Sequence, residues 1–204
     1  VNEVETEVKA IVPIMRSEFN FLRYPFFDIS HKTSTRKKLE IRETITTEEG
    51  TFENFWKVSR NVDSNFPASF ARRIHTEVVE RTINELRKPI PQLVKLGSLR
   101  DICQKLNILI SGKNTKNIRN ALIATKAALI ETRGTFRTKE NNGAKKFFEG
   151  AFSLYDGVFF TGEKLPDGSK ADAVYVLLNA MYVQNYNNGF TVPMDYRYLQ
   201  SLNG

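Results

Sequence analysis

The chain has 204 residues, 41% of them hydrophobic, which suits one large domain or two small ones with a true apolar core. Its single cysteine, Cys103, excludes an internal disulfide framework and fits a reducing cytosol, and no apolar run is long enough for a membrane span. The formal net charge of +7 indicates an acidic partner, of which nucleic acid is the commonest.

The positive charge is concentrated in one part of the sequence. Between Ser98 and Lys170, thirteen Lys/Arg residues stand against seven Asp/Glu, whereas residues 1–97 have sixteen against fourteen and residues 171–204 have one against two. A modest positive charge can serve solubility alone. Its localisation favours nucleic acid binding by the middle of the chain.

The N-terminal part combines a charged arm with an aromatic segment. Residues 1–10 start with Val1 and lack signal-peptide character, so we expect a partial or processed chain with a strand or a loose arm here. In the segment 21–30, FLRYPFFDIS, Phe26, Phe27 and Ile29 are predicted to lie in the core. A role in stacking on bases would need these rings to be exposed.

A β-hairpin and a long helix are predicted next. Residues 39–46 and 52–60 alternate apolar and polar side chains around a turn at Glu49-Gly50, and Trp56 is expected in the core. The longest helical pattern runs from Ser69 to Lys88 and ends at Pro89.

Two further helices joined by a polar turn are predicted between Gly97 and Gly134. Ser98 caps the first helix, with Asp101 placed for a capping box, and Ser111-Gly112 breaks the pattern. The second helix is expected to be capped by Asn114 or Thr115. One side of it is apolar, with Ile118, Ala121, Leu122, Thr125 and Leu129.

The opposite side of the second helix is polar and basic. Lysine and arginine neutralise phosphates, asparagine can form two hydrogen bonds with an adenine edge, and small alanines allow close approach to thymine methyl groups. A helix of this kind suits the major groove, although an ordinary solvated face is the commoner use of such a pattern. The side consists of Lys113, Lys116, Asn117, Asn120, Ala124 and Ala127, with Arg119 and Lys126 at its flanks.

The pattern after this helix changes to strands. Strands are predicted at 130–140, 145–155, 158–161 and 173–178, with turns at Asn142-Gly143 and at Leu165–Gly168. We interpret them as a twisted β ribbon with an exposed tip at about 163–170, where Lys164 and Lys170 can reach phosphates or a minor groove. A short strand at 190–192 and a helix starting at Asp195 follow.

This succession predicts an α+β fold, a winged helix-turn-helix with an N-terminal β-hairpin extension. The predicted division is an arm and hairpin at 1–62, a winged-helix domain at 63–192 and the start of a further segment at 193–204. The residues assigned to DNA contact are Lys113, Thr115, Lys116, Asn117, Arg119, Asn120, Lys126, Lys164 and Lys170.

Several motifs together resemble bacterial plasmid replication initiators of the replication initiator protein A type. They are NFLRYPFFDIS, RETITTEEGTFENFWKVS, the pair Phe66-Pro67, SLRDICQKLNI, SGKN, IRNALIATKAALIETR and VPMDYRYLQSL. The chain departs from the family at Ala68–Phe70, where an acidic residue is commoner. It also lacks the downstream half.

The resemblance implies sequence-specific binding of double-stranded DNA at repeated origin sites, in the bacterial cytosol and together with host replication proteins. It also implies that this chain is the N-terminal of two winged-helix units, with homodimerisation as a second role. Two alternatives remain open, a winged-helix transcriptional regulator and a dimerisation module without DNA contact. The latter would use exposed aromatics among Phe21–Phe27 and Tyr182–Tyr186.

Catalytic and metal-dependent functions find no support in the residue pattern. His31 and His75 are the only histidines and lie far apart, which argues against a nicking initiator and, with one cysteine, against a zinc finger. The segment 157–164, GVFFTGEK, has Glu163 where a phosphate-binding loop needs lysine. We therefore expect no enzyme activity, no metal and no cofactor.

Overall fold

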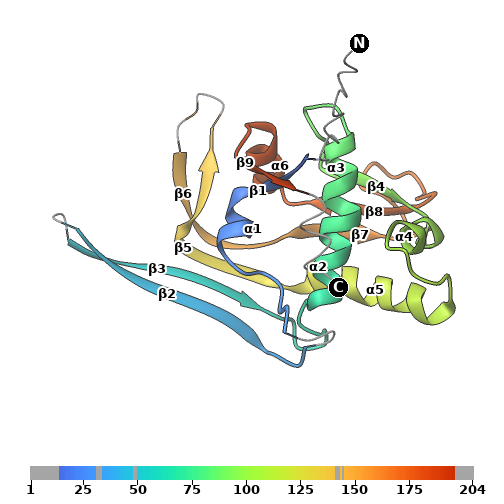
Figure 1. The fold of residues 1–204 in the computed structure, drawn as a ribbon, viewed down its shortest axis with the longest axis horizontal. Coiled ribbons are helices and arrows are strands. Elements are labelled where there is room, and N and C mark those ends of the chain that lie inside the picture. Colours follow the sequence, from blue (N-terminus) through green and yellow to red (C-terminus); the bar gives the residue numbers. More distant parts are fainter. Residues whose placement is uncertain (1–13, 31–33, 48–49, 141–142, 144, 196–204) are drawn as a thin grey trace, which may run out of the picture.

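The structure is a computed structural model that describes residues 14–30, 34–47, 50–140, 143 and 145–195 (Figure 1). The arm at 1–10, and Glu49 and Asn142 of the two predicted turns, lie outside these residues. Asp195, where a helix is predicted to start, is instead the last residue of the strand β9 (Thr191–Asp195), and the residues after it lie outside the described part. The predicted α+β class is confirmed. The helical segments are α1 (Phe19–Arg23), α2 (Ser69–Ile74), a π-helical turn (His75–Glu80), α3 (Arg81–Glu85), α4 (Leu99–Lys105), α5 (Gly112–Ala127) and α6 (Ala180–Asn187).

The strands of the described residues form three antiparallel sheets, β1-β9, β2-β3-β5-β6 and β4-β8-β7. The predicted single ribbon after α5 is therefore corrected, because β5 and β6 extend the sheet of β2 and β3, whereas β7 and β8 pair with each other and β8 also pairs with β4. The strands are β1 (Ile14–Glu18), β2 (Lys38–Thr47), β3 (Gly50–Ser59), β4 (Leu93–Gly97), β5 (Leu129–Lys139), β6 (Lys145–Ser153), β7 (Tyr155–Phe159), β8 (Val174–Leu178) and β9 (Thr191–Asp195).

The predicted hairpin is confirmed as β2 and β3, which project from the body as a long twisted ribbon (Figure 1). At its inner end Trp56 and Val58 are fully buried. The indole nitrogen of Trp56 donates a hydrogen bond to the carbonyl of Pro25 (2.9 Å), and its ring stacks on Tyr24. Ordinary alternation of side chains therefore anchors the hairpin by one face.

The aromatic segment contributes two of its three predicted core side chains to the core. Phe26 is buried and Phe27 partly buried, but Ile29 is 64% exposed, which contradicts its predicted place. The reason lies at Asp28, whose backbone nitrogen bonds to Pro67 and whose carboxylate bonds to Ser34. The chain turns there, so the next side chain points outward.

The long helix starts at Ser69 as predicted and ends at Glu85, three residues earlier than expected. Leu86 already has an extended backbone. The middle of the helix is π-helical, a rare conformation that often accompanies functional or strained sites. Polar side chains of this turn are buried, among them His75, Glu77 and Glu80.

Besides Glu77, two buried carboxyl groups and a histidine lie around this turn. Glu80 accepts hydrogen bonds from the hydroxyls of Ser17 (3.1 Å) and Tyr182 (3.3 Å), and burial raises its pKa to about 8. His75 shares a hydrogen bond with the hydroxyl of Tyr155 (2.8 Å), and burial lowers its pKa to about 3. The Nε2 atom of His75 has no hydrogen-bond partner and lies 3.8 Å from Glu80.

The second carboxyl group, that of Glu18, ties three parts of the chain together. It accepts hydrogen bonds from the side-chain amides of Asn20 and Asn185, each at 2.7 Å, and burial raises its pKa to about 7. Both asparagines also donate to the backbone carbonyl of Arg137 in β5. At neutral pH a large share of Glu18 and Glu80 is therefore protonated.

The stability of the protein should fall as pH rises from about 5 to about 8. The unfolded chain releases the protons of Glu18 and Glu80 near the ordinary pKa of 4.5, whereas the folded chain holds them to about 7 and about 8. Between these pKa values, each of the two carboxyl groups lowers the free energy of unfolding by about 1.4 kcal/mol for every unit by which the pH rises. His75 acts in the opposite sense, so its contribution is lost as pH falls below 6.5.

Urea unfolding of the wild type and of Glu80→Gln between pH 5 and pH 8.5 tests this expectation. The variant keeps a polar side chain without a titrating proton and should show a flatter decline above neutrality. Glu85→Gln is the matched control, because Glu85 is exposed on α3. Equal slopes for the wild type and Glu80→Gln would contradict the assignment.

Candidate nucleic-acid interface

The first helix of the predicted pair is α4, and its capping is as expected. The Ser98 hydroxyl accepts a hydrogen bond from the backbone nitrogen of Asp101 (3.2 Å), and the Asp101 carboxylate accepts one from the backbone nitrogen of Ser98 (2.7 Å). Ile102, Cys103 and Leu106 are fully buried. The capping box and this apolar side together fix α4 on the body.

The second helix, α5, begins earlier than predicted. Its N-cap is Ser111, whose hydroxyl accepts a hydrogen bond from the backbone nitrogen of Asn114 (3.2 Å), so the assignment of Asn114 or Thr115 as cap is wrong. The side chain of Asn114 instead donates to the carbonyl of Leu109 (2.7 Å) and closes the turn. The turn also holds Asn107 at a φ of 50°, a conformation that asparagine tolerates.

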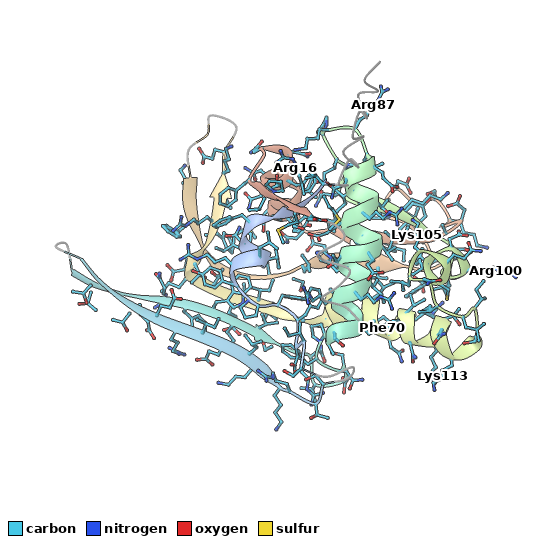
Figure 2. The ribbon with its side chains drawn as sticks, in the orientation of Figure 1. Arg16, Phe70, Arg87, Arg100, Lys105 and Lys113 are labelled. Atoms are coloured by element: carbon cyan, nitrogen blue, oxygen red, sulfur yellow. The ribbon has the colours of Figure 1, made fainter. Side chains whose placement is uncertain are left out.

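The apolar side of α5 packs inward through Ile118 and Leu122, which leaves its polar side in solvent. Thr115 is half-buried and its hydroxyl donates to backbone carbonyls of its own helix, so it is less available than its neighbours. Figure 2 shows Lys113 pointing outward at the start of α5. The exposed side chains of α5 assigned to DNA contact are Lys113, Lys116, Asn117, Arg119, Asn120 and Lys126.

The predicted alanine lining of this surface is partly wrong. Ala124 is only 6% exposed, and Ala127 is half-buried. The cause is that α5 contacts α2, β6 and β7 as well as α4, so the covered part of the helix is broader than one amphipathic stripe. The apolar side chain exposed on this surface is Ile123, at 45%.

The charge at the start of α5 is unusual for a helix. Lys113 and Lys116 lie in its first turns, there is no acidic residue in the first turn, and none occurs anywhere in Gly112–Ala127. The N-terminal end of a helix carries partial positive charge. Each exposed cation there therefore destabilises the helix by about 0.3–1 kcal/mol. An anion bound outside the protein would offset this cost.

The β7 and β8 strands are joined by residues 160–173, which carry the predicted exposed tip at about 163–170. Lys164 and Lys170 lie opposite each other across the ribbon and are both exposed. Backbone hydrogen bonds extend beyond the strands to Gly162, Leu165 and Ala171, so the tip is an ordered hairpin. The predicted position of the tip is therefore correct.

One arginine joins α5 to this ribbon. The guanidinium carbon of Arg119 lies 3.9 Å from the centre of the Phe160 ring, and Phe160 directly follows β7. The structure thus brings Arg119 and the other α5 residues together on one helix, with the ribbon attached beside it. Sequence reasoning did not identify Phe160.

A second residue that sequence reasoning missed is Arg100. It is exposed on α4 and points outward from the helical pair, as Lys113 does (Figure 2). The sequence signal that could have identified Arg100 is its position in the first turn of α4, the helix that precedes α5. Its charge adds to the same end of the molecule.

Cations elsewhere on the protein are often neutralised by carboxylates, as Arg42 is by Glu40 and Glu53, and Arg133 by Glu149. Among the described residues, none of the six cations of α5 and the ribbon tip forms an ion pair with a carboxylate. No cluster of metal-ligating side chains occurs among the described residues. Over the same residues, no helix is both long and apolar enough to cross a bilayer.

Comparison with known proteins yields structural similarity alone. No family model and no curated protein matches the chain. A crystal structure of domains 2 and 3 of RctB, with selenomethionine, shares 11% identity at a TM-score of 0.46 and covers 79% of this chain and 57% of its own. A second crystal structure of these RctB domains shares 10% identity at a TM-score of 0.45 and covers 91% and 59%.

The chain therefore spans somewhat under three-fifths of the RctB chains that it resembles. At these TM-scores and identities the similarity carries no inference about function.

Proposed function

We propose that this chain binds double-stranded DNA through a winged helix, as the N-terminal unit of a plasmid replication initiator. In this proposal α5 enters the major groove, where Asn117 and Asn120 read base edges and Lys113 and Lys116 contact phosphates. The ribbon tip contacts the backbone or the minor groove alongside. The role is one of binding in the bacterial cytosol, without catalysis, at origin repeats and with host replication proteins.

The observation that carries the proposal is the exposed, acid-free surface of α5 with unpaired cations at the helix end where cations are least favourable. The connectivity supports it as well. A helical segment, β4, α4 and α5 precede the ribbon, and β8 pairs with both β4 and β7. We assign the winged-helix unit to residues 63–192, with β5 and β6 as an inserted hairpin that joins the sheet of the N-terminal extension.

The double variant Lys116→Ala with Asn120→Ala tests the assigned surface. Binding to a selected duplex site should weaken by roughly 1–3 kcal/mol for a lost base contact, and wild-type affinity should fall steeply with salt. Fluorescence anisotropy with a labelled duplex measures both. Arg133→Ala, which removes one exposed charge on the inner strand β5, is the control and should bind as the wild type does. Unchanged binding in the double variant would rule out this surface.

Replication separates an initiator from a winged-helix transcriptional regulator, which would use the same surface. A test plasmid whose only origin is the gene with its flanking repeats should be maintained with the wild-type chain in the full-length protein. It should be lost with the double variant. Maintenance that does not depend on the gene would favour the regulator.

Homodimerisation is part of the proposal, because β2 forms one edge of the four-stranded sheet and an exposed edge can pair with another strand. The mass in solution, measured by light scattering from micromolar to millimolar chain, should rise towards twice the monomer mass. A monomer throughout would contradict this part. Four of the aromatic side chains that an interaction module would expose are buried, which argues against this alternative. They are Tyr24, Phe26, Tyr182 and Tyr186.

A further inference from the structure

The contact between Arg119 and Phe160 connects the two elements that the proposed function assigns to DNA. The guanidinium of Arg119, from the middle of α5, lies over the ring of Phe160 with 3.9 Å between its carbon and the ring centre. This distance is well within the range of a cation–π contact. The stack therefore joins the helix to the base of the ribbon tip.

Phe160 is held in place by the burial of its ring and by two hydrogen bonds between its backbone and Glu163. Phe160 is 4% exposed, its backbone nitrogen donates to the carboxylate of Glu163 (2.8 Å), and its carbonyl accepts from the backbone nitrogen of Glu163 (2.9 Å). A ring with so little freedom provides a fixed platform. Arg119, an exposed side chain that would otherwise sample many rotamers, is ordered on it.

The stack leaves the edge of the guanidinium available. Cation–π contact uses the face of the group, whereas its five N–H donors lie in the plane and match two oxygens of a phosphate. A second stacked arginine in this chain shows the contrast. Arg42 lies over Phe55 (4.6 Å), but its N–H groups already donate to Glu40 and Glu53.

We propose that Phe160 is a positioning residue for DNA binding, which holds the guanidinium of Arg119 at the junction of α5 and the ribbon so that it binds one backbone phosphate of the duplex. This inference rests on the proposed function and adds a residue that does not itself touch DNA. Because a phosphate contact carries no sequence information, its effect should be the same for any duplex.

The test is a double-mutant cycle on the 204-residue chain with a fluorescein-labelled duplex of random sequence, measured by anisotropy over a range of KCl concentrations. Arg119→Ala and Phe160→Leu should each weaken binding about five- to tenfold, and the double variant should be no weaker than either one. Arg119→Ala should also reduce the salt slope by about 1. Phe160→Trp keeps an aromatic face and should retain wild-type affinity, and thermal unfolding confirms that each variant folds.

The matched controls are Arg137→Ala and Phe147→Leu, which break the stack of Arg137 over Phe147 (5.0 Å) on the β5–β6 hairpin and should leave DNA binding unchanged. Wild-type affinity and salt slope in Phe160→Leu, or additive losses in the double variant, would overturn this proposal. If Lys116→Ala with Asn120→Ala abolishes site-specific binding while the Phe160 variants bind normally, only the positioning role falls. If the wild type binds no duplex at low salt, the proposed function falls and the positioning role with it.

Discussion

The architecture depends on a buried hydrogen-bond network that no single sheet could supply. Glu18 from the N-terminal strand, Asn185 from α6 and the backbone of Arg137 in β5 meet through short hydrogen bonds, with Asn20 bonded to both Glu18 and Arg137. Buried polar groups are costly unless each one is paired, so removing one member would leave the others unsatisfied. This network fixes the small β1–β9 sheet to the larger sheet.

The candidate DNA surface differs from this network, because its charged side chains are exposed and have no ion-pair partner among the described residues. The body neutralises many of its cations locally, as at Lys57 and Glu131. The α5 helix combines buried Ile118 and Leu122 with lysines at its unfavourable end, so its inner side provides stability and its outer side adds none. Such a division is expected when an external anion completes the electrostatics.

Local patterns predicted much of this fold, and non-local pairing accounts for most of what they missed. The capping box at Ser98, the burial of Trp56 and the ribbon tip around Gly168 follow from spacing and turn chemistry, and all are present. The partners of β5 and β6 could not be foreseen, because consecutive strands look alike whichever sheet they join. Nor could the burial of Ala124 and of Glu80, which depends on neighbours that are distant in sequence. The roles of the predicted DNA-contacting residues stay predictions.

The β5–β6 hairpin inserted between α5 and β7 has a consequence for the order of folding. The strand β4 must wait for β8, some eighty residues later, and β1 must wait for β9, the last strand described. Pairings of such long range are slow to form, because the chain loses the entropy of closing a long loop before the strand contacts stabilise it. During synthesis the β2–β3 hairpin and the α4–α5 pair can form from neighbouring residues as they emerge. The edges at Val94 and Met15 stay open until β8 and β9 have left the ribosome.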